Sequence, residues 1–331
     1  MNPHIDAQMK LRADLFEAKE QAPTRNGFGE GLVQAADADE RVIALCADLT
    51  ESTRMEAFAK KYPSRYVEVG VAEQNLAALA SGFAAYGMIP FITSYAAFSP
   101  GRNNEQIRTT ISLNNMPVKV VGSHAGVSVG PDGATHQALE DMALMRIQPT
   151  MTVISPCDAE EARKATIAAA EYAGPVYIRL AREKTPLMTS AETPFVFGKA
   201  NVLWKSESPQ CAIFATGPLV FNALVAARDL AEAGIDTTVV NIHTIKPLDM
   251  EAVIREAGAA GAVVTVEEHQ IAGGLGSAIA ECLAQNAPVP QEFIGVHDRF
   301  GQSGTMEELV AEYKMTAGDI AEAAKKAVSR K

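Results

Sequence analysis

The sequence predicts an α/β fold with two domains, each built on a mostly parallel sheet covered by helices. A chain of 331 residues is long enough for two domains of ordinary size. Apolar residues make up 47% of the chain, which is enough to fill both cores. Short apolar segments alternate with helical ones in both halves, a pattern typical of parallel strands that are buried on both faces.

The first elements are helices and one strand. Residues 5–20 have the periodicity of an amphipathic helix and are followed by the breaker segment QAPTRNG. Residues 27–39 predict a second helix, and residues 41–48 predict a buried strand. The segment VAEQNLAALASGFAAYG predicts a helix that ends at Gly87.

Strands and helices continue to alternate up to residue 182. MPVKVVGSH predicts a strand that runs into a glycine-rich loop, and MTVISP and PVYIRL predict two more strands. Between the last two lies DAEEARKATIAAAEYAG, a predicted helix. Asp158 is its expected N-cap, and Glu161 has the capping-box position.

Residues 183–209 interrupt this alternation and are richer in Pro, Ser, Thr and Lys. We therefore predict a first domain over 1–190, a linker over 191–209 and a second domain over 210–331. In the second domain, CAIFATG, TTVVNIHT, AVVTVEE and EFIGVHD predict strands, while NALVAARDLAEAG and GLGSAIAECLAQN predict helices. Ligands of such sheets bind beyond the carboxyl ends of the strands.

Composition excludes several classes of protein. A formal charge of −11 argues against a general nucleic-acid binder, because phosphate backbones need a basic surface. No apolar run reaches the roughly 18–20 residues of a membrane helix, and the charged N-terminus lacks the apolar core of a signal peptide. Four dispersed cysteines form no CxxC pair, which predicts buried thiols, no structural zinc and a cytoplasmic protein.

Three segments carry the side chains of a candidate site: VEVGVAEQNL, FITSYAAFSPGRNNEQIR and GSHAGVSVGPDGATHQ. Their chemically capable residues are Glu73, Tyr95, Phe98, Arg102, His124, Asp132 and His136. Each has an ordinary structural explanation. A glutamate in the first turn of a helix is favoured by the helix dipole. Two aromatics three residues apart can face a core from a helix, and loop histidines can bond to their own loop.

Taken together and in this order, these segments resemble the pyrimidine-binding domain of transketolase. The resemblance begins near PTRNG, continues through CADLTEST and GVAEQN, and passes the aromatic segment and DGATHQ to reach IRLAREKTP. HTIKPLD and VEEHQIAGGLGSAIAE resemble the C-terminal domain of the same family. The most specific evidence is GVAEQN together with GVSVGPDGATHQ, and the resemblance covers most of the chain.

The resemblance implies a thiamine-diphosphate site. Glu73 matches the glutamate that hydrogen-bonds the aminopyrimidine ring and favours its imino tautomer, which then takes the proton from the thiazolium C2 carbon. Phe98 and Tyr95 match aromatic residues that pack on the pyrimidine. Arg102 is assigned to the same cofactor site, and Asp48 to the subunit interface near it.

The resemblance also implies a substrate site. Four residues match those that bind the phosphate of a sugar phosphate in transketolases: Arg25, Ser52, His124 and Arg182. Guanidinium, hydroxyl and imidazole groups suit a dianion. Asp132 matches an aspartate that reads a sugar hydroxyl, and His136 matches a histidine beside the cofactor-bound ketol unit. The implied catalytic residues are Glu73, His124 and His136.

The metal-binding part of a transketolase has no counterpart in this sequence. Transketolases hold Mg²⁺ with a GDG motif and a later asparagine, whereas the PDG at 131–133 stands inside the predicted substrate loop. The expectation is a split transketolase whose partner chain supplies all metal ligands, in an α2β2 assembly. The implied reaction transfers a two-carbon ketol unit between sugar phosphates and requires both chains.

Two alternatives stay open. A beta-type subunit of a 2-oxoacid dehydrogenase, or a deoxyxylulose-phosphate-synthase-like enzyme, would have a similar domain plan. His124, eight residues before Asp132, favours transketolase, because the synthase family has an acidic residue at that position. A non-catalytic scaffold on this fold is disfavoured, since Glu73 and the residues expected to bind phosphate are all present.

The GGLG segment at 273–276 has two interpretations. It precedes a predicted helix and could bind an anion there, but glycines that allow tight backbone packing are the favoured explanation. Nearby His243, Glu268 and His269 are predicted to be structural or interface residues.

Overall fold

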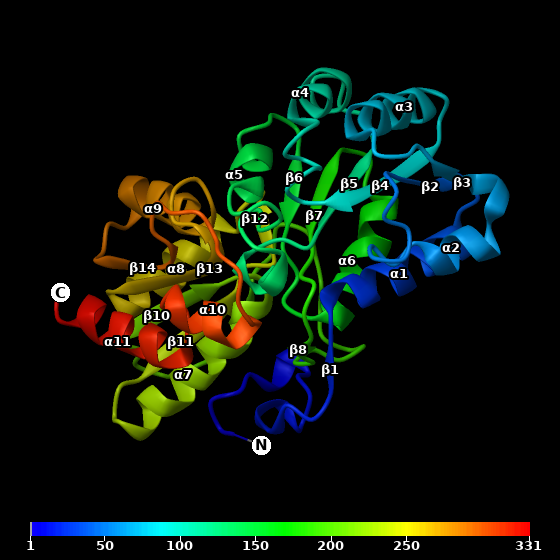
Figure 1. The fold of residues 1–331 in the computed structure, drawn as a ribbon. Helices are drawn as coiled ribbons and strands as arrows, with labels where there is room; N and C mark the ends of the chain where they lie inside the picture. The colour runs from blue at the N-terminus through cyan, green and yellow to red at the C-terminus, as the bar shows by residue number, and fades with distance from the viewer. Residues whose placement is uncertain (1) are drawn as a thin grey trace.

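The computed structural model describes residues 2–331 and has the predicted α/β class, with two sheets and their covering helices (Figure 1). The helices are α1 Thr24–Ala38, α2 Glu56–Lys61, α3 Glu73–Ala85, α4 Asn104–Gln106, α5 Asp141–Arg146, α6 Ala159–Glu171, α7 Val220–Glu232, α8 Met250–Ala260, α9 Leu275–Asn286, α10 Met306–Glu312 and α11 Ala317–Val328. The strands are β1 Gln21–Ala22, β2 Val42–Cys46, β3 Tyr66–Glu68, β4 Ile89–Tyr95, β5 Lys119–Ser123, β6 Thr152–Ile154, β7 Val176–Arg179, β8 Thr185–Pro186, β9 Asn201–Trp204, β10 Cys211–Ala215, β11 Thr237–Asn241, β12 Thr244–Lys246, β13 Val263–Gln270 and β14 Gln291–Val296. In this part of the chain, no helix is both long and apolar enough to span a bilayer.

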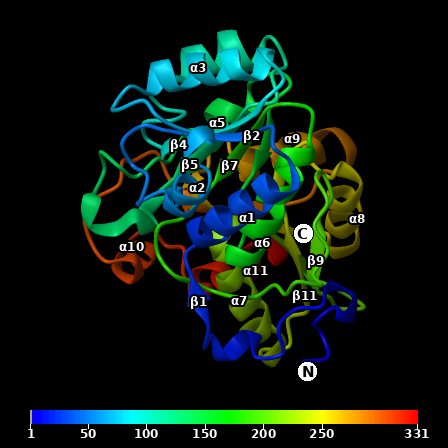
Figure 2. The ribbon, with the colours of Figure 1, turned by 90° about the vertical axis from the view of Figure 1, so that its right-hand side faces the viewer.

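The first sheet has the strand order β12-β6-β7-β5-β4-β2-β3. All neighbours are parallel except β12, which runs antiparallel to β6. α1 and α6 pack on one face, where Phe28 and Leu32 meet Val121, and α3 and α5 cover the other face (Figure 2). Burial on both faces explains why these strands are continuously apolar. Their parallel direction gathers the carboxyl ends of β2, β4, β5 and β7 at one edge.

The second sheet has the order β14-β13-β10-β11-β9, with β9 antiparallel to β11. α8 and α9 cover the face that continues into the core of the first sheet, and α7 and α11 cover the other face. The predicted linker contains a strand, because β9 lies within it and belongs to the second sheet. One strand crosses between the halves of the chain: β12 follows β11 in sequence but joins the first sheet. The domain limits proposed from sequence therefore stay a prediction.

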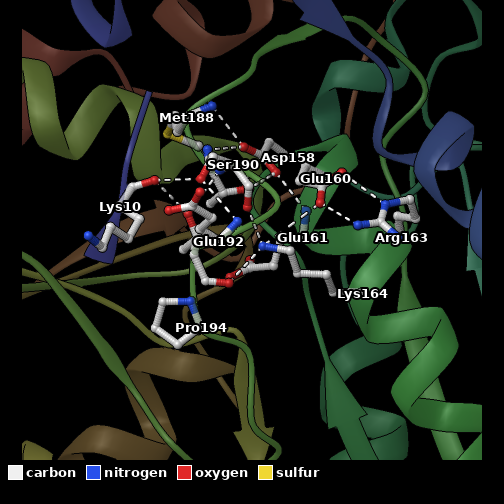
Figure 3. A network of polar contacts seen from close by, with 12 residues as sticks. Lys10, Asp158, Glu160, Glu161, Arg163, Lys164, Met188, Ser190, Glu192 and Pro194 are labelled. Atoms are coloured by element: carbon white, nitrogen blue, oxygen red, sulfur yellow. Dashed lines mark hydrogen bonds and ion pairs between the residues drawn. The ribbon is translucent and has the colours of Figure 1, made fainter. Parts of the chain in front are cut away.

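Residues 188–194 are fastened to the start of α6 by a polar network (Figure 3). The Asp158 carboxylate accepts from the backbone N–H groups of Glu161 at 2.8 Å, Met188 at 2.7 Å and Thr189 at 2.6 Å. Lys164 Nζ donates to the carbonyl of Thr193 at 2.7 Å. Asp158 is therefore the helix N-cap, as predicted, and it also anchors the segment that leads to the second sheet.

Glu161 does not complete the predicted capping box. Its carboxylate instead accepts from the N–H of Cys157 at 2.7 Å and from Asn241 Nδ2 at 2.8 Å, so it joins α6 to β11. Burial, reinforced by the charge of Asp158, raises the pKa of Glu161 to about 7.

The predicted helix over residues 5–20 is wrong. This segment forms two short 3-10 turns, Ala7–Met9 and Leu15–Glu17, each followed by a residue with positive φ, Lys10 and Ala18. Leu11 and Leu15 are buried against the second sheet, and packing on that irregular surface outweighs local helix propensity.

Candidate functional site

The candidate site lies where the first sheet's strands end. Tyr95 is the last residue of β4, His124 follows β5, and Arg182 follows β7 by three residues. Arg25 lies in the first turn of α1, which begins at the same edge. The structure thus brings together side chains that are distant in sequence, at the edge where parallel sheets bind their ligands.

Glu73 is the first residue of α3, and its side chain is 2% exposed. Arg102 Nη1 lies 3.0 Å from Glu73 Oε2 and forms an ion pair from a side chain that is 52% exposed. Asn103, which the sequence did not suggest, fixes this helix start because its Nδ2 donates to the Glu73 carbonyl at 2.9 Å and to Ser99 Oγ at 3.1 Å. A buried carboxylate is therefore held at the site with one cationic partner.

Arg102 connects this carboxylate to a group of aromatic rings. Tyr95 and Phe98 have centroids 6.0 Å apart with planes 21° from parallel. Tyr95 stacks on His124 at 3.9 Å, Phe98 meets the edge of His136 at 5.3 Å, and the Arg102 guanidinium lies 5.3 Å from the Phe98 centroid. The explanation as a core-facing helical pair is wrong, because Tyr95 ends a strand and Phe98 lies in the turn that follows it.

The cations predicted to bind phosphate also converge. Arg25 Nη1 donates to the Ser52 carbonyl at 2.7 Å and lies 3.4 Å from His124 Nε2. Arg182 Nη1 donates to the Val129 carbonyl at 2.7 Å. Arg54, which the sequence did not suggest, donates from Nε to Asn26 Oδ1 at 2.9 Å, next to Arg25 on α1. We call Arg25, Ser52, Arg54, His124 and Arg182 the cationic cradle.

Electrostatics in the cradle favour an anionic ligand. Burial, followed by the charges of Arg54 and Arg182, lowers the pKa of Arg25. Burial, followed by the charges of Arg25 and Arg182, lowers the pKa of His124 to about 3. His124 is therefore neutral at physiological pH, and since Arg25 donates toward Nε2, the Nδ1–H donates to Ser123 Oγ at 2.9 Å. Like charges held together in this way repel one another until an anion binds.

The loop predicted to bind the substrate, residues 124–138, carries Asp132 and His136, and we call it the substrate loop. Asp132 is 32% exposed at its side chain and lies 3.5 Å from Arg182 Nη1. His136 Nδ1 contacts Thr135 Oγ1 at 2.8 Å while its ring meets Phe98.

Asp48, predicted to lie at the subunit interface, is exposed after β2. Its backbone N–H donates to Glu68 Oε1 at 2.7 Å, and its interface role stays a prediction.

The second domain offers neither an anion site at GGLG nor a metal cluster. Glu267 accepts from the N–H groups of Leu275 at 2.8 Å and Gly276 at 2.7 Å, so a carboxylate of the chain itself already caps α9. A Cβ on Gly274 would lie 2.0 Å from Glu267 Oε2, which confirms the tight-packing explanation. His243, Glu268 and His269 are buried, as expected of structural residues. Within residues 2–331, no three His, Cys, Asp or Glu side chains are grouped to hold a metal ion.

Comparison with known proteins gives consistent matches. A family model described as "Transketolase, pyrimidine binding domain" matches residues 20–188, and one described as "Transketolase, C-terminal domain" matches residues 198–320. The 6-deoxy-6-sulfo-D-fructose transketolase subunit SqwH of Clostridium sp. (strain MSTE9) is 41% identical over 96% of this chain and 98% of its own length. The putative transketolase C-terminal section of Methanocaldococcus jannaschii is 41% identical over 90% and 93%. A solved structure described as "Split gene transketolase, inactive beta4 tetramer" has a TM-score of 0.87 at 41% identity, covering 93% of this chain and 99% of that one.

Proposed function

Because the chain belongs to the transketolase family, we propose that it is one subunit of a split enzyme that transfers a two-carbon ketol unit between sugar phosphates. The observation that carries the proposal is the meeting of buried Glu73, the Tyr95–Phe98 pair and the cationic cradle at one sheet edge. Relatives of nearly the same length are named as transketolase subunits.

The residues present fit thiamine diphosphate. An aminopyrimidine is flat and carries N–H donors, which suits an aromatic surface next to a buried carboxylate acceptor. Glu73, Tyr95, Phe98 and Arg102 would hold that ring. When bound, the cofactor supplies the electron sink that stabilises the two-carbon carbanion, while the protein binds and orients.

Glu73 performs the proton chemistry of this chain. Arg102 holds its Oε2 atom, which leaves Oε1 to form the hydrogen bond with a ring nitrogen. Asn103 fixes the backbone carbonyl of Glu73 and with it the start of α3, so the carboxylate keeps one orientation. The carboxylate is buried, which would exclude water and strengthen that hydrogen bond.

The cradle and the substrate loop bind the sugar. Arg25 and Arg182 would form charge-assisted hydrogen bonds to a phosphate dianion, and neutral His124 would add a polar contact. Binding would also relieve the repulsion between Arg25 and Arg54. Asp132 would accept from a sugar hydroxyl, and His136 would hold or pass a proton at the ketol oxygen.

The partner is expected to be a chain with the diphosphate-binding domain. In the proposed α2β2 complex it would supply every Mg²⁺ ligand, and both chains would act in the cytoplasm. A structurally similar protein at 41% identity is described as an inactive tetramer of beta chains, which supports the need for a second type of chain.

Reconstitution tests the proposal. The chain is mixed with the candidate partner, thiamine diphosphate and Mg²⁺, and ketol transfer is measured from xylulose 5-phosphate to ribose 5-phosphate and to other aldose phosphates. Each chain alone and the Glu73→Gln complex are the controls. We expect activity only in the wild-type mixture. Activity of this chain alone, or full activity with Glu73→Gln, would contradict the assignment.

A further inference from the structure

The substrate loop is held from outside its own domain. One side faces the first sheet, and the other packs on Glu268 near the end of β13 and on the segment Gly301–Gly304. α10, which follows that segment and is labelled in Figure 2, contacts the 3-10 turn Val127–Asp132 within the loop. The C-terminal domain therefore contributes directly to the surroundings of Asp132 and His136.

Gln137 forms the first of two connections between this loop and the C-terminal domain, which we call ties. Its side chain is buried, and Nε2 donates to the Val127 carbonyl at 3.0 Å and to the Gln302 carbonyl at 2.9 Å. One amide thus closes the substrate loop on itself and binds it to the C-terminal domain. A Cβ on Gly301 would lie 1.8 Å from Gln137 Oε1, so this close approach requires a glycine.

Glu268 at the end of β13 forms the second tie. Its Oε1 accepts from the backbone N–H of Ser128 in the loop. Gly126, at φ +90°, has no room for a side chain, because a Cβ would lie 2.4 Å from Glu268 Oε1. Arg179 Nη2 then joins the far end of the loop, since it donates to the carbonyls of Glu268 at 2.8 Å and Ala138 at 3.3 Å.

From this geometry we propose that the C-terminal domain is a brace that shapes the substrate loop, with Gln137 and Glu268 as positioning residues. Neither side chain reaches the cradle or the aromatic pair in any hydrogen bond of the described residues. Both fix the backbone that presents Asp132 and His136. The proposal rests on the proposed function and assigns the C-terminal domain a role in sugar binding, not cofactor binding. Active-site groups need support of this kind to keep a productive geometry.

The test uses the reconstituted complex with Gln137→Met, which keeps the side-chain length and removes both donors. The control is Gln302→Ala, because its backbone carbonyl, the acceptor, is retained and its side chain is exposed. In Gln137→Met we expect KM for the phosphorylated sugar to rise about tenfold, as misplacement of binding groups predicts, with thiamine-diphosphate affinity within about twofold of wild type. Amide hydrogen exchange over residues 126–138 should accelerate in the variant and stay unchanged in the control.

Two further variants separate positioning from general destabilisation. Glu268→Gln keeps an oxygen acceptor for Ser128 and should retain a near-normal KM, whereas Glu268→Ala should behave like Gln137→Met. An unchanged KM and unchanged exchange in Gln137→Met would overturn the brace, as would equal losses of sugar and cofactor binding. If the wild-type complex transfers no ketol unit, the proposed function fails, while the exchange rates still decide whether the brace exists.

Discussion

Replacing Arg25 by Met should separate phosphate binding from every other contribution to turnover. Arg25 comes from the first turn of α1 and reaches His124 and the Ser52 carbonyl, so it stands inside the cradle. Met keeps much of the side-chain length and removes the charge and all donors. The hydrogen bonds of Arg25 go to Ser52 and His124 and not to Glu73, Tyr95 and Phe98, the residues proposed to hold the cofactor, which should be unaffected.

The expected magnitude follows from the hydrogen bonds that the substitution removes. A hydrogen bond to a charged group is worth about 1.5–3 kcal/mol, which corresponds to about 10- to 150-fold in kcat/KM at 1.36 kcal/mol per tenfold. Folding should change little. The variant loses the bond to the Ser52 carbonyl, which is worth about 1.5–3 kcal/mol because the guanidinium is charged, but it also relieves repulsion from Arg54 and Arg182, the charges that help to lower the pKa of Arg25, and this relief offsets the loss.

The assay compares a phosphorylated acceptor with its unphosphorylated sugar in the reconstituted complex, and urea unfolding reports stability. We expect the loss only with the phosphorylated acceptor, together with an unfolding free energy within about 1 kcal/mol of wild type. An equal loss with both acceptors would refute the reasoning, because Arg25 would then support the site structurally. The Arg54→Gln variant is a matched comparison that should show a smaller effect of the same kind.

Three further outcomes can be measured. Glu73→Ala should leave the fold intact and lower turnover by at least ~100-fold; near-normal turnover in a well-formed complex would remove Glu73 from the mechanism. Burial lowers the pKa of His124 and of His243 to about 3, so the unfolded chain binds more protons between pH 3 and 6.5 and stability falls as pH drops through that window. His124→Gln should make this fall shallower in urea titrations, and an unchanged slope would show that His124 is charged when folded. Burial also lowers the pKa of Lys119 to about 7, so stability should rise between pH 7 and 10.5 by up to about 1.4 kcal/mol per pH unit. Lys119→Met should abolish this rise, and its persistence would assign it to other groups.

Local patterns predicted most of the fold. Buried parallel strands such as β2, β5 and β10 are continuous apolar segments, and the helices between them have clear amphipathic or capping signals. The helix predicted over residues 5–20 was wrong because the leucines of this segment pack on the second sheet without regular structure. β12 could not be predicted, since three residues have no periodicity and their partner strand β6 lies about ninety residues earlier.

In the candidate site, too, the sequence predicted the residues that lie in local motifs and missed those whose role depends on distant contacts. Glu73, the aromatic pair and most of the cradle lie in motifs that can be recognised from the sequence. Arg54 was missed because only the fold places it next to Arg25, and Asn103 because its role is to hold a backbone carbonyl. The Gln137–Gln302 tie joins residues 165 positions apart and was not predictable from either segment.

Some residues of the candidate site are held by nearby segments of the chain, and others are held by distant ones. The residues proposed to hold the cofactor are fixed within the first domain, where Asn103 anchors the start of α3 and β4 presents Tyr95. The residues proposed to meet the sugar depend on the second domain through Gln137 and Glu268. Both sheets also share one apolar core, and β12 completes the first sheet from the second half of the chain. We therefore expect changes in the C-terminal domain to alter the proposed sugar binding through the shape of one loop while the proposed cofactor contacts stay the same.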